Sequence, residues 1–425
     1  MSAQTSPSAS PLRSLPNRRS VLANVVAPAL RRPEAAAAAV FSAVRRRGPV
    51  SRDVIATASG LSIATVNRQV SALLDAELLR ERPDLAVPGA IGRPRVPVEV
   101  NHEPYLTLGL HIGARTTSIV ASDLLGRTLD AVEMPTPAGS QAAGLESLAV
   151  SAQRYLARWR RRRPLWVGVA VGGVVHSASG HIDHVRLGWQ DAAVGPVLAR
   201  AIGVPVSVAS HVDAMAGAEL LLGAPQDRGA ASGLYVYARE TVGFAQVIDG
   251  RVHTPASGPG TVAGLPVQSE MLGGTGILET TVSDEAVLAA ARARGMVPAS
   301  GPNSSMAALL KIARSDGGRA ALDARELLVE RARVLGGAVA LLRDMLNPDE
   351  VVVGGQAFTD YPEAVGTVQA VFAERSVLGG RDITLTRFGG RVQEAGAGIV
   401  SLSSLYADPV GALRRSSSRR LEASA

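Results

Sequence analysis

The sequence of 425 residues contains no cysteine. Without thiolates, a chain cannot form disulfides, hold an iron–sulfur cluster or build a cysteine-ligated zinc site. These classes of site are therefore excluded, and the sequence gives no indication of a cofactor.

Long apolar runs are also missing. The most apolar stretches, VLANVVAPAL and AAAAAVFSAV, are ten residues long, and Pro28 interrupts the first of them. A membrane-spanning helix needs about 20 apolar residues, and the first residues do not form a basic, apolar, small-residue signal peptide. We therefore expect a cytoplasmic protein with no membrane partner.

Positive charge is concentrated in the first quarter of the chain. Residues 1–100 contain fourteen Arg, no Lys and seven Asp or Glu, a net charge of +7, and the whole chain also carries +7. The remaining residues are therefore neutral on balance. A basic module attached to a neutral body is typical of nucleic-acid binding, and the alternative at this level is a basic tail that serves only solubility.

Patterns with a regular period begin at about residue 33. Residues 1–32 are rich in Ser, Pro, Ala and Arg without a period, and residues 411–425 have the same character, so both predict disordered tails. Between them, the sequence predicts a DNA-binding domain over 33–101 and a larger body over 102–410.

Three short helical patterns occupy the start of the DNA-binding domain. The first ends at Gly48, Ser51 precedes the second, and Ser62 precedes the third, as capping residues do. The residues expected to face the core are Val40, Phe41 and Val44 in the first helix, Val54, Ile55 and Ala58 in the second, and Val66, Val70, Leu73 and Leu74 in the third.

The outer face of the third helix carries small, polar and singly basic residues. Such a face suits the major groove, where hydroxyl, amide and guanidinium groups read base edges or hold phosphates. A helix that is merely solvated more often carries Glu and Lys. The candidate DNA-binding residues on the helices are Arg52, Ser62, Ala64, Thr65, Asn67, Arg68 and Ser71.

The segment RERPDLAVPGAIGRPRVPVEV follows with the pattern of two strands joined by a loop. Its tip holds Arg93 and Arg95 in a compact extended basic stretch, which suits a narrow, A·T-rich minor groove. Without the three preceding helices, this tip would be read as an ordinary surface turn. Together with the three helices, the segment predicts a winged helix-turn-helix whose wing also binds DNA.

From Tyr105 onward, short apolar strands alternate with longer helical stretches. The strands include LTLGLHIG, WVGVAVGGVV, VPVSVAS, GLYVYA, FAQVIDG and EVVVGG. This alternation predicts an α/β body.

In order and spacing, the motifs resemble the ROK family of repressors, open reading frames and sugar kinases, and specifically its regulators with a winged helix-turn-helix. The resemblance covers residues 33–410 and depends on the series LSIATVNRQVSALLDAELL, GRPRVPVEVN, LGLHIG, LGWQD, GVPVSVASHVDAMAGAELLLGA, VIDGRV, GGTGILE, NPDEVVVGG and EAGAGI. It implies an actin-like, hexokinase-like body of two α/β lobes with a sugar cleft between them.

The residues that match the family's catalytic and phosphate-binding positions differ from those of its kinases. In the first phosphate turn His111 replaces an acid, Ala114 a glycine and Arg115 a small hydroxyl residue, while residues 239–243 replace a glycine-rich second turn. The resemblance places the family's catalytic Asp at His211. Histidine can act as a general base, but a structural histidine is the more frequent role.

The zinc and sugar positions have changed as well. Thr261 and Gly264 match a Glu and a His that contact sugar or metal in many family members. Of the family's metal-binding cysteines, the two whose positions can be matched in this sequence are replaced by Leu272 and Ile277. Glu279 alone keeps a family sugar-contact residue. The candidate ligand-binding residues are therefore Glu279 and His211, and we expect no metal.

These observations predict a sequence-specific, DNA-binding transcriptional regulator with a catalytically silent body. Its expected partners are double-stranded DNA and further copies of itself, in a dimer or tetramer. Three alternatives stay open: a repressor that responds to a sugar or another small-molecule effector, an active sugar kinase with a DNA-binding head, and an oligomerisation scaffold.

Overall fold

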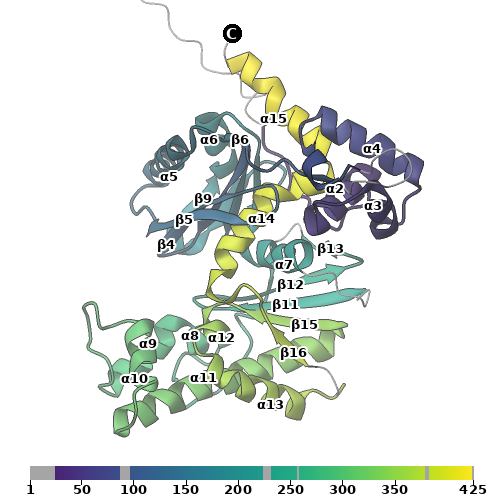
Figure 1. Ribbon diagram of the computed structural model, residues 1–425. Coiled ribbons are helices and arrows are strands. Elements are labelled where there is room, and N and C mark those ends of the chain that lie inside the picture. The colour runs from purple at the N-terminus through teal and green to yellow at the C-terminus, as the bar shows by residue number, and fades with distance from the viewer. Residues whose placement is uncertain (1–23, 87–95, 224–230, 256–257, 379–381, 424–425) are drawn as a thin grey trace, which may run out of the picture.

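The computed structural model describes residues 24–86, 96–223, 231–255, 258–378 and 382–423. The chain forms an N-terminal domain beside a body of two α/β lobes, which lie one above the other in Figure 1. Across these ranges, no helix is long and apolar enough to cross a membrane. The mixed α/β class and the two-lobed body expected from the sequence are confirmed.

The N-terminal domain packs helices against a small antiparallel sheet. Its elements are α2 (Ala36–Arg47), α3 (Arg52–Ser59), α4 (Ile63–Asp75), β1 (Leu79–Glu81), a 3₁₀ turn (Pro83–Leu85) and β2 (Val98–Val100). The predicted core residues Val40, Phe41, Val44, Ile55, Val66, Val70 and Leu73 are buried where the helices meet.

Two residues of the second helix were assigned to the wrong face. Val54 is 40% exposed and Ala58 is also exposed, whereas Ile55 is fully buried. Val54 and Ala58 share one stripe of α3, and Ile55 lies about 100° around the helix from it. The helix has eight residues and buries only the stripe of Ile55.

The first lobe contains a five-stranded sheet in the order β10-β6-β3-β4-β5. Strands β3 (Tyr105–Ile112), β4 (Thr116–Ser122) and β5 (Thr128–Pro135) are antiparallel, and β6 (Arg163–Val171) and β10 (Val206–Ser210) extend the sheet in parallel. A smaller sheet contains β7 (Val174–His176), β8 (His181–His184) and β9 (Trp189–Ala192), and the helices are α5 (Gln141–Leu156) and α6 (Val194–Ile202).

The second lobe repeats this arrangement. Its sheet has the order β13-β12-β11-β15-β16, with β14 (Gly260–Thr261) also paired to β12. Its strands are β11 (Ser232–Ala238), β12 (Val242–Ile248), β13 (Arg251–Val252), β15 (Glu350–Gly354) and β16 (Ile383–Leu385). Its helices are α8 (Leu278–Val282), α9 (Asp284–Ala293), α10 (Met306–Ala313), α11 (Arg319–Leu346), α12 (Gln356–Thr359) and α13 (Val365–Arg375).

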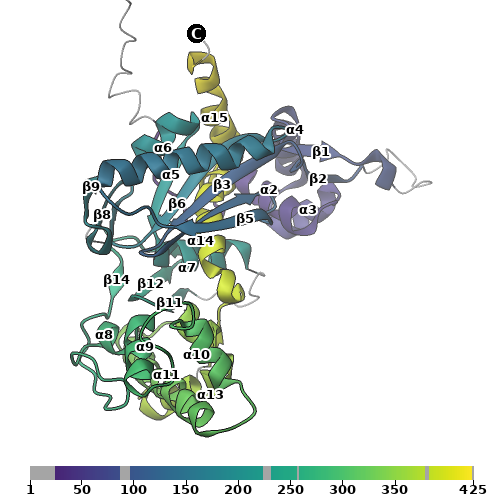
Figure 2. The ribbon, with the colours of Figure 1, turned by 90° about the vertical axis from the view of Figure 1, so that its left-hand side faces the viewer.

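Two helices pack against each other between the sheets. Helix α14 (Val392–Ala407) lies on the first-lobe sheet, and α7 (His211–Leu222) lies on β11 and β12 of the second lobe. Figures 1 and 2 show α5 and α6 on the outer side of the first lobe and α14 between the lobes. The approach of α14 is close: a Cβ built on Gly109 of β3 would lie 2.6 Å from the Ala397 carbonyl carbon. Glycine is therefore required there.

The end of the predicted N-terminal tail is ordered against the body, so disorder up to residue 32 is wrong for residues 24–32. The Val26 amide donates to the Val206 carbonyl in the first lobe at 2.9 Å, and the Arg32 amide donates to the Gly250 carbonyl in the second lobe at 2.8 Å. Leu30 between them is buried. Apolar residues spaced along an otherwise polar segment attach it to both lobes.

The predicted C-terminal tail is also ordered over most of its length. Residues Pro409–Ala423 form helix α15, which packs on α14 and the N-terminal domain. Ala412 and Ser416, four residues apart, are buried on one face of it. The disorder prediction was wrong because this face is made of small residues, which give a weak amphipathic signal.

Candidate nucleic-acid interface and interlobe cleft

The start of α4 is held by its capping serine. Ser62 precedes the helix, and its hydroxyl oxygen accepts a hydrogen bond from the Thr65 amide at 3.2 Å. The Ser62 hydroxyl donates to the Thr65 hydroxyl at 3.0 Å. Both side chains therefore support the end of the helix that a winged helix-turn-helix presents to DNA.

The outer face of α4 is available to a partner. Thr65 is half-buried, and the exposed residues are Ala64, Asn67, Arg68 and Ser71. Arg68 forms no hydrogen bond or ion pair with any other residue that the structure describes. The structure thus brings five of the predicted contact residues onto one surface, with an unpaired guanidinium among them.

Arg52 occupies a different environment. It begins α3, and its guanidinium lies 3.3 Å from a carboxylate oxygen of Glu81 at the end of β1. Exposed ion pairs of this kind contribute about 0 to 1 kcal/mol. A phosphate can therefore replace Glu81 as the partner of Arg52 at little cost.

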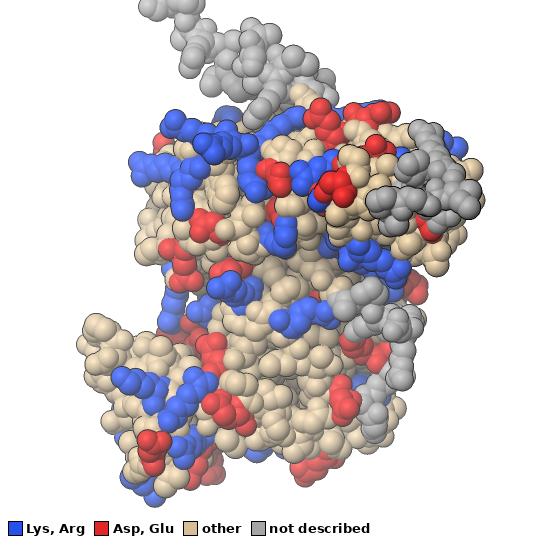
Figure 3. Space-filling view, viewed as in Figure 1, with Lys and Arg blue, Asp and Glu red and all other residues tan. Residues whose placement is uncertain are grey.

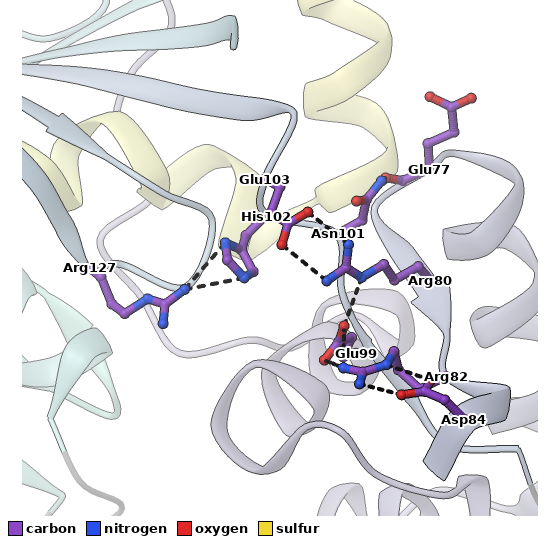
Figure 4. Close-up of polar contacts among 9 residues, drawn as sticks. All are labelled: Glu77, Arg80, Arg82, Asp84, Glu99, Asn101, His102, Glu103 and Arg127. Carbon is purple, nitrogen blue, oxygen red and sulfur yellow. Dashed lines mark hydrogen bonds and ion pairs between the residues drawn. The ribbon is translucent and has the colours of Figure 1, made fainter. Parts of the chain in front are cut away.

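The arginines at the base of the wing are already paired (Figure 4). The guanidinium of Arg80 lies 2.7 Å from Glu99 and 3.0 Å from Glu103. That of Arg82 lies 2.6 Å from Asp84 and 3.0 Å from Glu99, and its hydrogen bond lowers the pKa of the Asp84 carboxyl. These ion pairs neutralise the arginines beside β1 and β2.

The predicted wing-tip residues Arg93 and Arg95 lie outside the described residues. The strands that flank the tip are described: β1 and β2 pair antiparallel, with Leu79 opposite Val100 and Glu81 opposite Val98. Contact between the tip and a minor groove therefore stays a prediction.

Ile63 was missed as a surface residue. It is the first residue of α4 and is 50% exposed, beside the polar contact face. An exposed apolar side chain at this end of a recognition helix suits contact with a thymine methyl group. The sequence carried a signal, because Ile63 lies off the buried stripe of Val66, Val70 and Leu73.

The body contains a cleft of about 480 Å³ between its lobes. The β3–β4 turn and the β11–β12 turn line it from opposite sides. These are the two turns that match phosphate-binding turns of the family. In Figure 3, basic side chains are densest on the first lobe, and acidic side chains lie among basic ones on both lobes.

Two histidines line the cleft, of which His111 is buried and His211 is half-buried. The rings of His111 and His211 are parallel, with centroids 6.0 Å apart, and His211 also contacts the Tyr237 ring at 4.9 Å. Burial lowers the pKa of His111 to about 3 and that of His211 to about 4. Both rings are therefore neutral at pH 7, and His111 Nε2 has no hydrogen-bond partner among the described residues.

Ion pairs connect the two lobes across the cleft. Arg115 of the first-lobe turn lies 3.5 Å from Glu240 of the second-lobe turn. Arg186, which follows β8, lies 3.8 Å from Glu240 and 3.2 Å from Glu279. The other carboxylate oxygen of Glu279 accepts a hydrogen bond from the Val242 amide at 3.3 Å. The predicted sugar-contact residue is therefore engaged by the protein itself.

Asp213 is a buried carboxyl that sequence reasoning did not single out. Burial raises its pKa to about 7. It lies in the first turn of α7, where its amide donates to the Ser210 hydroxyl at 3.2 Å. Asp213 is not among the residues that line the cleft, so its carboxyl lies apart from the position that the resemblance matches to the family's catalytic Asp.

The zinc site of family kinases does not fit these residues. The Thr261 hydroxyl donates to the Val242 carbonyl at 3.0 Å, and Gly264 offers no ligand atom on a side chain. The described part of the chain contains no group of three or more His, Asp or Glu side chains placed to hold a metal ion.

A family model described as "ROK family" matches residues 107–399. A transcriptional regulator from Mycobacterium tuberculosis (strain ATCC 25618 / H37Rv) is 69% identical over 400 residues, covering 92% of this chain and 90% of the relative. The DNA-binding transcriptional repressor Mlc of Escherichia coli (strain K12) is 23% identical over 335 residues, covering 75% and 80%.

Solved structures share the fold. A ROK family transcriptional regulator described as a homologue of E. coli Mlc superposes with a TM-score of 0.70 at 24% identity, covering 89% of this chain and 96% of that one. A ROK family glucokinase from Streptomyces griseus, in complex with glucose and AMPPNP, gives 0.59 at 20% identity, covering 70% and 99%. The regulator match covers a larger share of this chain than the glucokinase match does.

Proposed function

Because this chain belongs to the ROK family, we propose that it is a transcriptional regulator that binds specific sequences of double-stranded DNA and does not phosphorylate sugars. The observation that carries the proposal is a contrast between two sites. The face of α4 presents unpaired polar groups to solvent, whereas the charges of the cleft are paired with one another.

The DNA-binding part of the proposal depends on α4. Its exposed Asn67 and Arg68 carry the amide and guanidinium groups that read base edges, and Ser71 offers a hydroxyl one turn further on. Small Ala64 lets the helix approach the groove closely. Arg52, Arg93 and Arg95 supply phosphate and minor-groove contacts in this proposal.

Catalytic silence is supported by what occupies the two phosphate turns. The ion pair between Arg115 and Glu240 joins the positions between which the transferred phosphate would lie. An acidic side chain there repels phosphate, and His111 cannot hold a metal-bound phosphate as an acid would. His211, with a pKa of about 4 through burial, is a weak base for a sugar hydroxyl at pH 7.

We further propose that the protein acts as a dimer or tetramer. One winged domain covers a limited length of DNA, and a two-fold pair reads two half-sites separated by helical turns. Light scattering of the free protein at micromolar concentration tests this point. A monomer with full operator affinity would contradict it.

A small-molecule effector is the second candidate role of the cleft. Its volume of about 480 Å³ suits a small ligand. His111 Nε2 and Glu240 Oε2 are buried there without hydrogen-bond partners among the described residues. Simple hexoses are poor candidates, because Glu279 is already engaged and a sugar needs several convergent polar partners.

The experiment that tests the proposal maps the bound sites across the genome of the source organism and measures binding to the recovered operator. Titration of glucose, N-acetylglucosamine and xylose by calorimetry accompanies it, and we expect no binding tighter than millimolar. Absence of any enriched sequence would reject the regulator. A hexose that binds at micromolar concentration and releases the operator would restore the sugar-responsive alternative.

A further inference from the structure

Helix α2 ends in three consecutive arginines that have different surroundings. Arg46 and Arg47 are exposed and have no ion-pair partner in the described ranges, whereas Arg45 is half-buried against the body. Its guanidinium donates to the Leu221 carbonyl at 2.7 Å and to the Leu125 carbonyl at 3.5 Å.

The same guanidinium lies over an aromatic ring of the body. Its carbon is 4.4 Å from the centroid of the Tyr406 ring, and Phe41 of α2 contacts that ring at 6.2 Å. The Tyr406 hydroxyl is buried and donates to the Leu124 carbonyl at 3.2 Å, which fixes the ring. Arg45 therefore combines a cation–π contact with hydrogen bonds to two main-chain carbonyls.

The body groups that Arg45 contacts belong to the two helices between the lobes. Leu221 is in the last turn of α7, where unpaired carbonyls and the helix dipole favour a cation. Tyr406 is in the last turn of α14. The opposite ends of both helices reach the cleft, with His211 starting α7, and Gln393 of α14 donating to the Tyr237 hydroxyl at 3.0 Å.

We propose that Arg45 is a positioning residue for DNA binding: it docks the winged helix-turn-helix onto the ends of α7 and α14 and so fixes the orientation of α4. The inference rests on the proposed DNA-binding function. Arg45 differs from the predicted DNA-contact residues in its surroundings. Arg68 is exposed to solvent, whereas the guanidinium of Arg45 is held by Leu221, Leu125 and Tyr406.

A second junction holds the other side of the domain. Glu103, just after β2, pairs with Arg80, and His102 lies 3.2 Å from the Arg127 guanidinium of the first lobe (Figure 4). Loss of Arg45 therefore leaves the domain tethered by this junction and by α15, but removes the contact that fixes the end of α2 on α7 and α14. The expected consequence is a change in orientation rather than a loss of folding.

The first test needs no DNA. Amide hydrogen exchange is measured across α2 in the full-length wild type, Arg45→Met and Arg47→Met proteins. Arg47→Met is the matched control, because it removes an exposed charge from the same helix end. We expect exchange in α2 to accelerate roughly tenfold in Arg45→Met and to stay at the wild-type rate in Arg47→Met. Equal rates in all three proteins would overturn the proposal.

The second test measures binding to the operator as a function of salt. A residue that contacts phosphate lowers the slope of log K against log[salt] by about 1 when removed, and one that reads a base relaxes sequence preference. For Arg45→Met we expect a roughly tenfold loss of affinity with slope and base preference unchanged. Arg68→Met is the comparison, with relaxed base preference.

The possible outcomes separate the alternatives. A lower slope or relaxed base preference in Arg45→Met would make Arg45 a DNA contact and overturn the proposal. Arg45→Lys keeps the charge near the Leu221 carbonyl but lacks the planar fork, so it should restore part of the affinity and of the exchange protection. This conservative variant also serves as the test if Arg45→Met does not fold. Absence of DNA binding by the wild type would reject the proposed function, while the exchange result would still decide the docking.

Discussion

The face of α4 and the interlobe cleft use polar side chains in opposite ways. On α4, Asn67 and Arg68 point to solvent, and Arg68 makes no polar contact with other described residues. In the cleft, Arg115 and Arg186 hold Glu240 and Glu279 across the gap between the lobes. The charge of Arg68 on α4 is therefore available to an external partner, whereas the charges of the cleft neutralise one another.

This difference indicates where the chain retains a binding function. An unpaired guanidinium in water costs little and gains two strong hydrogen bonds when it meets guanine or phosphate. A ligand that enters the cleft must first replace ion pairs that are partly shielded from water, such as that of Glu240, whose side chain is 16% exposed. The shared fold by itself therefore does not decide whether the cleft performs kinase chemistry.

The largest expected effect concerns catalysis. We expect hexose-dependent ATP turnover to stay at the background rate, because loss of a positioned base alone costs about 10²- to 10⁴-fold and the phosphate turns are also altered. A coupled assay with glucose, N-acetylglucosamine and xylose measures this, with a ROK glucokinase as positive control. Turnover that His211→Ala abolishes would contradict the silent body.

The next effect concerns acid stability. The pKa of His111 is about 3 in the folded protein and 6.5 in the unfolded chain, so the unfolded chain takes up a proton first as the pH falls. The contribution of His111 is complete above pH 6.5 and declines by about 1.4 kcal/mol per pH unit between pH 6.5 and 3. His211 acts in the same direction down to its pKa of about 4.

Asp213 opposes this trend. Its pKa of about 7 exceeds the unfolded value of 3.8, so its stabilising protonated form is gained as the pH falls from 7 to 3.8.

Because the pKa of His111 is lowered in the folded protein, we expect His111→Gln to flatten the decline of unfolding free energy between pH 6.5 and 4 by about 1.4 kcal/mol per pH unit. Denaturant titrations at several pH values measure it, with His253→Gln at an exposed site as control. An unchanged pH dependence would show that His111 is not buried in a neutral form.

A third effect tests the exposed face of α4. Arg68→Ala should cost roughly 1 to 3 kcal/mol of binding to the operator and relax preference at the base it contacts, with similar but smaller effects for Thr65 and Asn67. Competition binding with single-base operator variants measures both. Unchanged operator binding in this variant would remove α4 as the reading surface.

The wing makes a smaller and different contribution. Arg93→Ala or Arg95→Ala should weaken binding to all sequences about equally and lower the salt slope by about 1. The slope is obtained from binding measured between about 50 and 200 mM salt. The wild-type protein, measured on the same DNA, is the reference. A selective loss on one operator sequence would instead make the wing a base reader.

The smallest effect concerns the ion pair between Arg115 and Glu240 in the interlobe cleft. Arg115 is 58% exposed, so Arg115→Ala should change the free energy of unfolding by less than about 1 kcal/mol. Thermal or denaturant unfolding measures it, and the doubly altered protein with Glu240→Gln gives the coupling between the two residues. A coupling well above 1 kcal/mol would show that this ion pair stabilises the protein more than an exposed pair does.

Local patterns allowed much of this architecture to be predicted. Periodicity identified α2 and α4, Ser62 marked the start of α4, and the order of motifs led to the ROK fold. Such features depend on residues close together in the chain. The same reasoning was wrong for Val54 and for α15, where a short helix or a face of small residues gives little contrast between buried and exposed positions.

The sequence by itself determined which groups the chain has: no cysteine, histidines in place of two acids, and a basic N-terminal quarter. Only the tertiary structure decided which of these groups meet. It paired Glu279 with Arg186, 93 positions away, and placed Arg45 on Leu221, 176 positions away. Contacts over such separations leave no local period, because they arise from the packing of the two lobes and the N-terminal domain around α7 and α14. For that reason a free arginine such as Arg68 and a docked one such as Arg45 look alike in the sequence and differ in the fold.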